Sequence, residues 1–201
     1  YTLFLTADHA VVPVPAYLKS LKIPAGYFDY AAFRIYLNEL CQKYYGAADL
    51  IENFSNNQAF LNRDALDRLD LDAAEVSQRL ADDIINYEGV NKVVTARTLQ
   101  NTNFTSGIMT YIQNGYNQKL SGDIMMIPNP GMIYKRQTGT THGSGYSYDR
   151  HVPIMFFGKG VQKGRSREYA EIIDIAPTVS NLLQISFPNS HSGKILIEAL
   201  K

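Results

Sequence analysis

Short apolar runs, separated by stretches with helical spacing, constrain the fold of this chain more than any other feature of its sequence. The runs at 1–6, 122–127 and 152–157 consist mostly of strand-forming residues. Strands that are apolar throughout are typical of sheets covered by helices on both faces. The alternation of such strands with helices predicts an α/β fold, with a mostly parallel sheet flanked by helices.

The longest helix is predicted at 27–45, with Gly46 at its end, and a second at 72–87, opened by Asp72 as its cap. Cys41 is predicted to be a small buried residue of the first helix. The apolar residues predicted to form the inward face of that helix are Phe33, Leu37, Leu40 and Tyr44.

The middle of the chain predicts a smaller mixed α+β lobe, at about 49–118, attached to the main sheet. Strands at 50–54 and 58–61 flank Ser55-Asn56-Asn57, and asparagine tolerates the positive φ of a tight turn. These two strands are therefore predicted to form a hairpin. The other predicted elements are a strand at 90–99, a helix at 106–116, a long loop at 138–151 and a helix at 174–183 capped by Asp174.

The composition excludes several classes of function. The chain has 201 residues, enough for one domain, and 45% of them are hydrophobic. Lys and Arg together number 19, as do Asp and Glu, so the formal net charge is zero. We therefore expect no nucleic-acid partner, because that binding depends on an excess of cations. No apolar run reaches the ~18 residues of a membrane span.

The pair Asp8-His9 is the first candidate for chemistry. It follows the apolar run at 1–6, and functional residues of α/β proteins often lie just beyond the end of a strand. A carboxylate and an imidazole suit Zn²⁺ or a similar divalent ion. Neighbouring side chains of a strand point to opposite faces, so both can reach one ion only if the backbone turns there. An ordinary hydrogen-bonded loop pair remains the alternative.

The glycine-flanked His142 is the second candidate. Gly139 and Gly143 lie close to it in the loop, and glycine lets a backbone approach a ligand closely. The loop could present His142 to a metal, or it could be a plain surface loop. We predict a structural role for His151 and an exposed position for His191. Phosphate-binding loops, dinucleotide-binding motifs and the serine-hydrolase motif are absent from the sequence.

Three segments together resemble one family. Leu5-Thr6-Ala7-Asp8-His9 is similar to the T-A-D-H-G/A metal motif of the alkaline phosphatase superfamily. The segment 141–153 resembles the T-H-G-x-x-Y-D-x-H-V-P segment of its branch of phosphate-insensitive alkaline phosphatases and nucleotide pyrophosphatases/phosphodiesterases. Asp174-Ile175-Ala176-Pro177-Thr178 is similar to a helix found near the C-terminus of many members. The sequence of the segment 141–153 is more similar to the phosphatases than to the diesterases.

This resemblance implies hydrolysis of small-molecule phosphate monoesters by an enzyme with two zinc ions. It implies that Asp8 and His9 are ligands of the zinc ion that binds the nucleophile, and that His142 is a ligand of the other zinc ion. It implies no ligand role for His151. In the family a Thr or Ser attacks phosphorus and forms a covalent phospho-enzyme. That nucleophile and the remaining ligands precede the matching segments, so no catalytic nucleophile is expected in this chain.

The resemblance further implies that the chain is the C-terminal portion of a longer enzyme, with an incomplete alkaline-phosphatase-like sheet. We expect the preceding portion of the same polypeptide to be its partner, and the chain alone to be inactive. Periplasmic or secreted location is implied because the family is usually exported. Two alternatives stay open: a phosphodiesterase or nucleotide pyrophosphatase of the same superfamily, and a binding module that kept the fold without catalysis.

Overall fold

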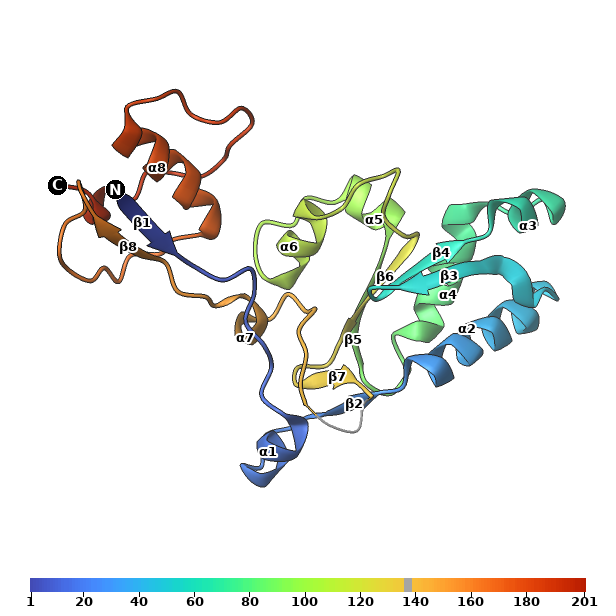
Figure 1. Ribbon diagram of the computed structural model, residues 1–201. Coiled ribbons are helices and arrows are strands. Elements are labelled where there is room, and N and C mark those ends of the chain that lie inside the picture. Colours follow the sequence, from blue (N-terminus) through green and yellow to red (C-terminus); the bar gives the residue numbers. More distant parts are fainter. Residues whose placement is uncertain (136–138) are drawn as a thin grey trace. The chain divides into compact units, whose positions relative to one another are not determined.

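The chain is built as two units that draw on different parts of the sequence. A computed structural model describes residues 1–135 and 139–201. Unit 1 joins residues 1–10 to residues 151–201, and unit 2 comprises residues 11–150. Figure 1 labels the helices and strands of both units. The smaller lobe at 49–118 follows neither boundary and stays a prediction.

A four-stranded antiparallel sheet forms the centre of unit 2. Its strands lie in the order β3 (Ile51–Ser55), β4 (Gln58–Leu61), β6 (Ile124–Pro128) and β5 (Val90–Thr95). The helices around it are α2 (Tyr30–Tyr45), α4 (Ala73–Ile84), α5 (Ala96–Asn101) and α6 (Ile108–Asn114). Ile124 and Met126 pack into the core made with α2 and α4, whereas Met125 packs with residues of α5 and α6. Helices thus cover both faces of β6, as its apolar run predicts.

The other elements are short. Unit 2 also contains α1 (Pro15–Ser20), β2 (Gly26–Phe28), η1 (Ala48–Leu50), α3 (Arg63–Arg68), β7 (Met132–Tyr134) and α7 (Ser147–Arg150). Unit 1 contains β1 (Thr2–Leu5), β8 (Met155–Gly158), η2 (Ile172–Asp174), α8 (Ile175–Leu183) and η3 (Ile197–Ala199). Among the described strands, β2 and β7 form the one parallel pair, and the other four pairings are antiparallel. Strand pairing inside this chain is therefore less parallel than the sequence predicts.

Helix α2 begins and ends for local reasons. Asp29 accepts a hydrogen bond from the amide of Ala32 (3.1 Å), which satisfies one free N–H of the first turn. Gly46 ends the helix with φ 67°. The predicted start at residue 27 was three residues early, because 26–28 pair with β7 as strand β2. The predicted inward face is confirmed, since Phe33, Leu37 and Leu40 are buried and Tyr44 is partly buried against the same core. Cys41 is buried, as predicted.

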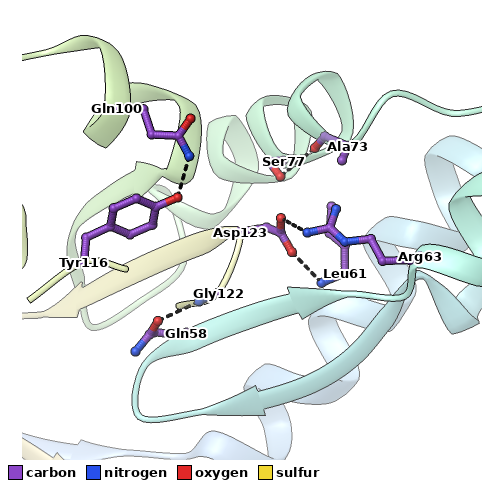
Figure 2. A network of polar contacts seen from close by, with 9 residues as sticks. All are labelled: Gln58, Leu61, Arg63, Ala73, Ser77, Gln100, Tyr116, Gly122 and Asp123. Atoms are coloured by element: carbon purple, nitrogen blue, oxygen red, sulfur yellow. Dashed lines mark hydrogen bonds and ion pairs between the residues drawn. The ribbon is translucent and has the colours of Figure 1, made fainter. Parts of the chain in front are cut away.

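The predicted hairpin of β3 and β4 is confirmed. Asn56 and Asn57 have φ of 50° and 62°, as the two central residues of a type I′ turn require. Gly122 donates a backbone hydrogen bond to the Gln58 side chain (2.8 Å). Asp123, just before β6, accepts from the Leu61 amide (2.9 Å) and from the Arg63 guanidinium (2.5 Å). Figure 2 shows these contacts, which tie the hairpin to the central strand.

Three boundaries differ from the sequence prediction. Strand β5 ends at Thr95 instead of residue 99, because the Thr95 hydroxyl accepts from the Thr98 amide (3.2 Å) and caps α5. The predicted loop at 138–151 contains the short helix α7, and its residue 138 lies outside the described residues. Asp174 precedes α8 as predicted, but its buried carboxylate does not cap that helix. It accepts instead from the amides of Glu171 (2.9 Å) and Lys194 (2.8 Å).

Strand β1 departs most from expectation. It is a strand, as predicted, but all four of its residues are exposed, and Leu3 keeps 57% of its surface. Its one neighbour among the described strands is β8, which runs antiparallel beside it in Figure 1. The prediction that both of its faces are covered is therefore wrong for the described chain, because successive side chains of a strand point to opposite faces and those of β1 are exposed on both.

Within residues 1–135 and 139–201, every helix is too short or too polar to cross a bilayer.

Candidate functional site

The first candidate pair begins three residues after the end of β1, with Asp8 in a bend and His9 next to it. The two side chains turn to the same side, with Asp8 Oδ2 3.6 Å from His9 Nε2. The His9 amide donates to Asp8 Oδ1 (3.1 Å). This is the backbone turn that one shared ion requires.

The His9 ring is held by a neighbouring backbone group. Nδ1 lies 2.9 Å from the carbonyl oxygen of Ala10. A carbonyl can only accept, so Nδ1 is the donor in this contact, and Nε2 is the ring nitrogen that faces Asp8. The Asp8 side chain is 88% exposed. A carboxylate oxygen and an imidazole nitrogen side by side fit a zinc ion as a partial set of ligands.

The second candidate, His142, lies exposed in the loop between β7 and α7 of unit 2. Two residues before it are anchored on Val12: the Thr140 hydroxyl donates to the Val12 carbonyl, and the Val12 amide donates to the Thr141 carbonyl (3.2 Å). These contacts hold the loop on the N-terminal side of His142.

The loop after His142 is held by Asp149, which is not among the candidate residues predicted from the sequence. Asp149 is 5% exposed. Its Oδ2 accepts from the amides of Gly143 (3.1 Å) and Ser144 (2.8 Å) and from the Ser144 hydroxyl (2.7 Å). Its Oδ1 is buried and has no hydrogen-bond partner among the described residues. In the sequence, the one indication of a role for Asp149 is its position in the segment 141–153 that resembles the family motif.

Helix α7, which carries Asp149, is itself tied to its surroundings. The Tyr146 hydroxyl donates to the Pro128 carbonyl (2.9 Å), and the Gly131 amide donates to the Tyr148 hydroxyl (3.1 Å). Arg150 donates to the Gly145 carbonyl (2.7 Å). The loop around His142 is therefore connected to the end of the central strand β6.

A cavity of about 470 Å³ in unit 2 adjoins His142 and Asp149. The first turns of α2 line it with Tyr30 and Arg34, and the hairpin turn lines it with Asn57. The Tyr30 hydroxyl donates to Asn57 Oδ1 (2.5 Å). Burial raises the pKa of Tyr30 above its usual value, although this hydrogen bond lowers it. The phenol is thus held neutral at the wall of the cavity.

The structure brings Asp8 and His9 together in unit 1 and places His142 in unit 2. Among the described residues, no three His, Cys, Asp or Glu side chains gather so that they could hold a metal ion. The assignment of these three residues to zinc stays a prediction. His191, exposed as expected, lies 2.9 Å from the Pro188 carbonyl through Nδ1, and His151 is exposed in a loop.

The sequence is similar to curated bacterial proteins over its whole length, although no family model matches it. Alkaline phosphatase PafA of Elizabethkingia meningoseptica is 32% identical over 202 residues, which are 100% of this chain and 37% of the relative. Alkaline phosphatase PhoV of Synechococcus elongatus is 34% identical over 206 residues (100% and 36%). A protein of Myroides odoratus named calcium-transporting ATPase is 37% identical over 203 residues (100% and 37%).

The fold, too, is similar to that of an alkaline phosphatase. The crystal structure of wild-type alkaline phosphatase PafA matches with a TM-score of 0.92 and 31% identity, over 100% of this chain and 38% of that chain. This match confirms the predicted α/β, alkaline-phosphatase-like fold. The chain spans little more than a third of the length of the relatives it matches. In sequence and in fold, it belongs to the alkaline phosphatase superfamily.

Proposed function

We propose that this chain is the C-terminal, metal-binding portion of an alkaline phosphatase that hydrolyses phosphate monoesters. The observation that carries the proposal is the whole-length match to PafA, in sequence and with a TM-score of 0.92. The candidate ligands Asp8, His9 and His142 are all present in the segments that resemble the family motifs. A non-catalytic binding module would have no physical reason to keep all three.

Asp8 and His9 would hold one zinc ion and His142 the other. Two bound metal ions would stabilise the charge on the attacking and leaving oxygens of the phosphoryl group. The contribution of this chain is to supply donors in fixed positions. His9 is oriented by its contact with the Ala10 carbonyl, and the His142 loop is anchored at Val12 and at Asp149.

The nucleophilic Thr or Ser and the other ligands would come from a preceding portion of the polypeptide. Two observations support this arrangement. The chain spans about 37% of the length of its relatives, and β1 has apolar exposed residues such as Leu3 and Leu5 and one edge without a partner among the described strands. A further strand would pair with that edge, and elements packed on the faces of β1 would cover those side chains. We propose export to the periplasm or beyond, as in the family.

The experiment is a comparison of two esters with the full-length protein. Hydrolysis of p-nitrophenyl phosphate faster than of bis-p-nitrophenyl phosphate, with zinc bound to the protein, is the expected result. The reverse preference would instead support the phosphodiesterase alternative. No turnover of either ester would contradict both, and would favour a binding module or the transport role in the name of the Myroides relative.

His142 and His151 form a matched pair of variants for the same assay. His142→Ala should lower turnover by orders of magnitude, because it removes a ligand of a metal that acts on the transition state. His151→Ala should leave the zinc content unchanged. The 201-residue chain alone should hydrolyse neither ester, and zinc-dependent turnover by it would refute the proposed upstream nucleophile.

A further inference from the structure

A buried carboxylate next to an exposed loop needs a physical reason. Taking a charge out of water is costly unless hydrogen bonds compensate for it. Asp149 is 5% exposed, and all three hydrogen bonds that its side chain accepts within the described residues come from Gly143 and Ser144. The charge of Asp149 is therefore directed at the two residues that follow His142.

The conformation of the loop is adapted to this contact. Gly143 has φ 127°, a backbone conformation that other residues rarely adopt. In this conformation the successive amides of Gly143 and Ser144 both reach Asp149 Oδ2. Hydrogen bonds to an ionised acceptor are about twice as strong as neutral ones. An otherwise exposed loop is thereby given one defined geometry.

The two anchors of the loop enclose His142. On one side, Thr140 and Thr141 are bound to Val12, and on the other, Gly143 and Ser144 are bound to Asp149. Fixing the residues on both sides of a side chain limits the positions that it can reach.

We propose that Asp149 is the positioning residue for His142, and that it sets the metal affinity of this histidine without being a ligand itself. The inference rests on the proposed function, in which His142 binds zinc. Groups that orient a ligand commonly change metal affinity by about 10- to 100-fold when they are removed. Oδ1, which has no partner among the described residues, leaves Asp149 able to accept one further hydrogen bond.

The test measures zinc affinity in the full-length protein, by competition with a chromophoric chelator, for Asp149→Ala and for a matched control. The control is Asp174→Ala, since Asp174 is also buried and also accepts from two backbone amides, those of Glu171 and Lys194. We expect Asp149→Ala to weaken binding of one zinc ion by about 10- to 100-fold. Asp174→Ala should lower the melting temperature and leave that zinc affinity unchanged.

A second measurement does not depend on zinc or on activity. Amide hydrogen exchange at Gly143 and Ser144 in the metal-free protein should become at least about tenfold faster in Asp149→Ala. Unchanged exchange would overturn the proposal, whether or not the protein is a phosphatase. If wild type binds no zinc but the exchange rises, the loop contact stands and the proposed function fails.

Two milder variants keep the test decisive if Asp149→Ala does not fold. Asp149→Asn retains an acceptor oxygen but loses the charge, and Ser144→Ala removes one of the three donors. We expect their zinc affinities to lie between those of wild type and Asp149→Ala. If Asp149→Asn kept the zinc affinity and amide exchange of wild type, the charge of Asp149 would not be needed for its role. If Asp174→Ala weakened zinc binding as much as Asp149→Ala, general destabilisation would explain the effect and the proposal would be wrong.

Discussion

Asp123 offers the sharpest test of how the hairpin is held on the central strand. Its carboxylate accepts from the buried amide of Leu61 and from the Arg63 guanidinium, as Figure 2 shows. Asp123→Ala leaves the Leu61 amide without a partner, and an unsatisfied buried donor costs roughly 1–3 kcal/mol. The Arg63 side chain is 58% exposed, so its ion pair adds at most about 1 kcal/mol after solvent screening. The expected loss in the free energy of unfolding is about 1–4 kcal/mol.

The matched control is Arg63→Ala, which removes the ion pair and leaves the Leu61 hydrogen bond. Its expected cost is below about 1 kcal/mol and should vanish at high salt, whereas the cost of Asp123→Ala should persist. Urea unfolding followed by circular dichroism measures both variants and the double variant. If Arg63→Ala destabilised the protein as much as Asp123→Ala, the reasoning would be wrong, because the ion pair and not the backbone contact would hold the hairpin.

Three further predictions concern single groups. Burial raises the pKa of Cys41 to about 11, so its thiol should resist iodoacetamide at pH 8 in the folded protein and react once it is denatured; rapid labelling of folded protein would contradict this. Asn57→Ala should destabilise the hairpin by roughly 1–2 kcal/mol in urea unfolding, because it loses a residue that tolerates positive φ and the acceptor of Tyr30, whereas Asn57→Gly should cost less. The hydrogen bond from Lys135 lowers the pKa of Asp29 in the folded protein, so the stability lost in Lys135→Met should be constant above the unfolded pKa of 3.8 and should disappear as the pH falls through the lower pKa of the folded state. A stability difference between wild type and Lys135→Met that grew in acid would refute the contact.

Local patterns in the sequence were enough for the features that depend on neighbouring residues. The buried face of α2 follows from helical spacing, and the turn at Asn56-Asn57 follows from the positive φ that asparagine tolerates. Asp72 caps α4 as predicted, accepting from the Glu75 amide (2.9 Å). The family, too, could be identified from short segments, because each retains its residue types in a fixed local order.

The tertiary structure decided what depends on residues that are distant in the sequence. Two of the three residues of strand β2, 27 and 28, were predicted as helix, because nothing near residues 26–28 shows that they pair with 132–134. Strand β1 was predicted to be buried from its apolar composition, but burial depends on which other elements cover a strand. Asp149 looked like one more polar loop residue. Only the folded chain shows its carboxylate buried against the amides beside His142, because burial and hydrogen-bond partners are properties of the packed molecule.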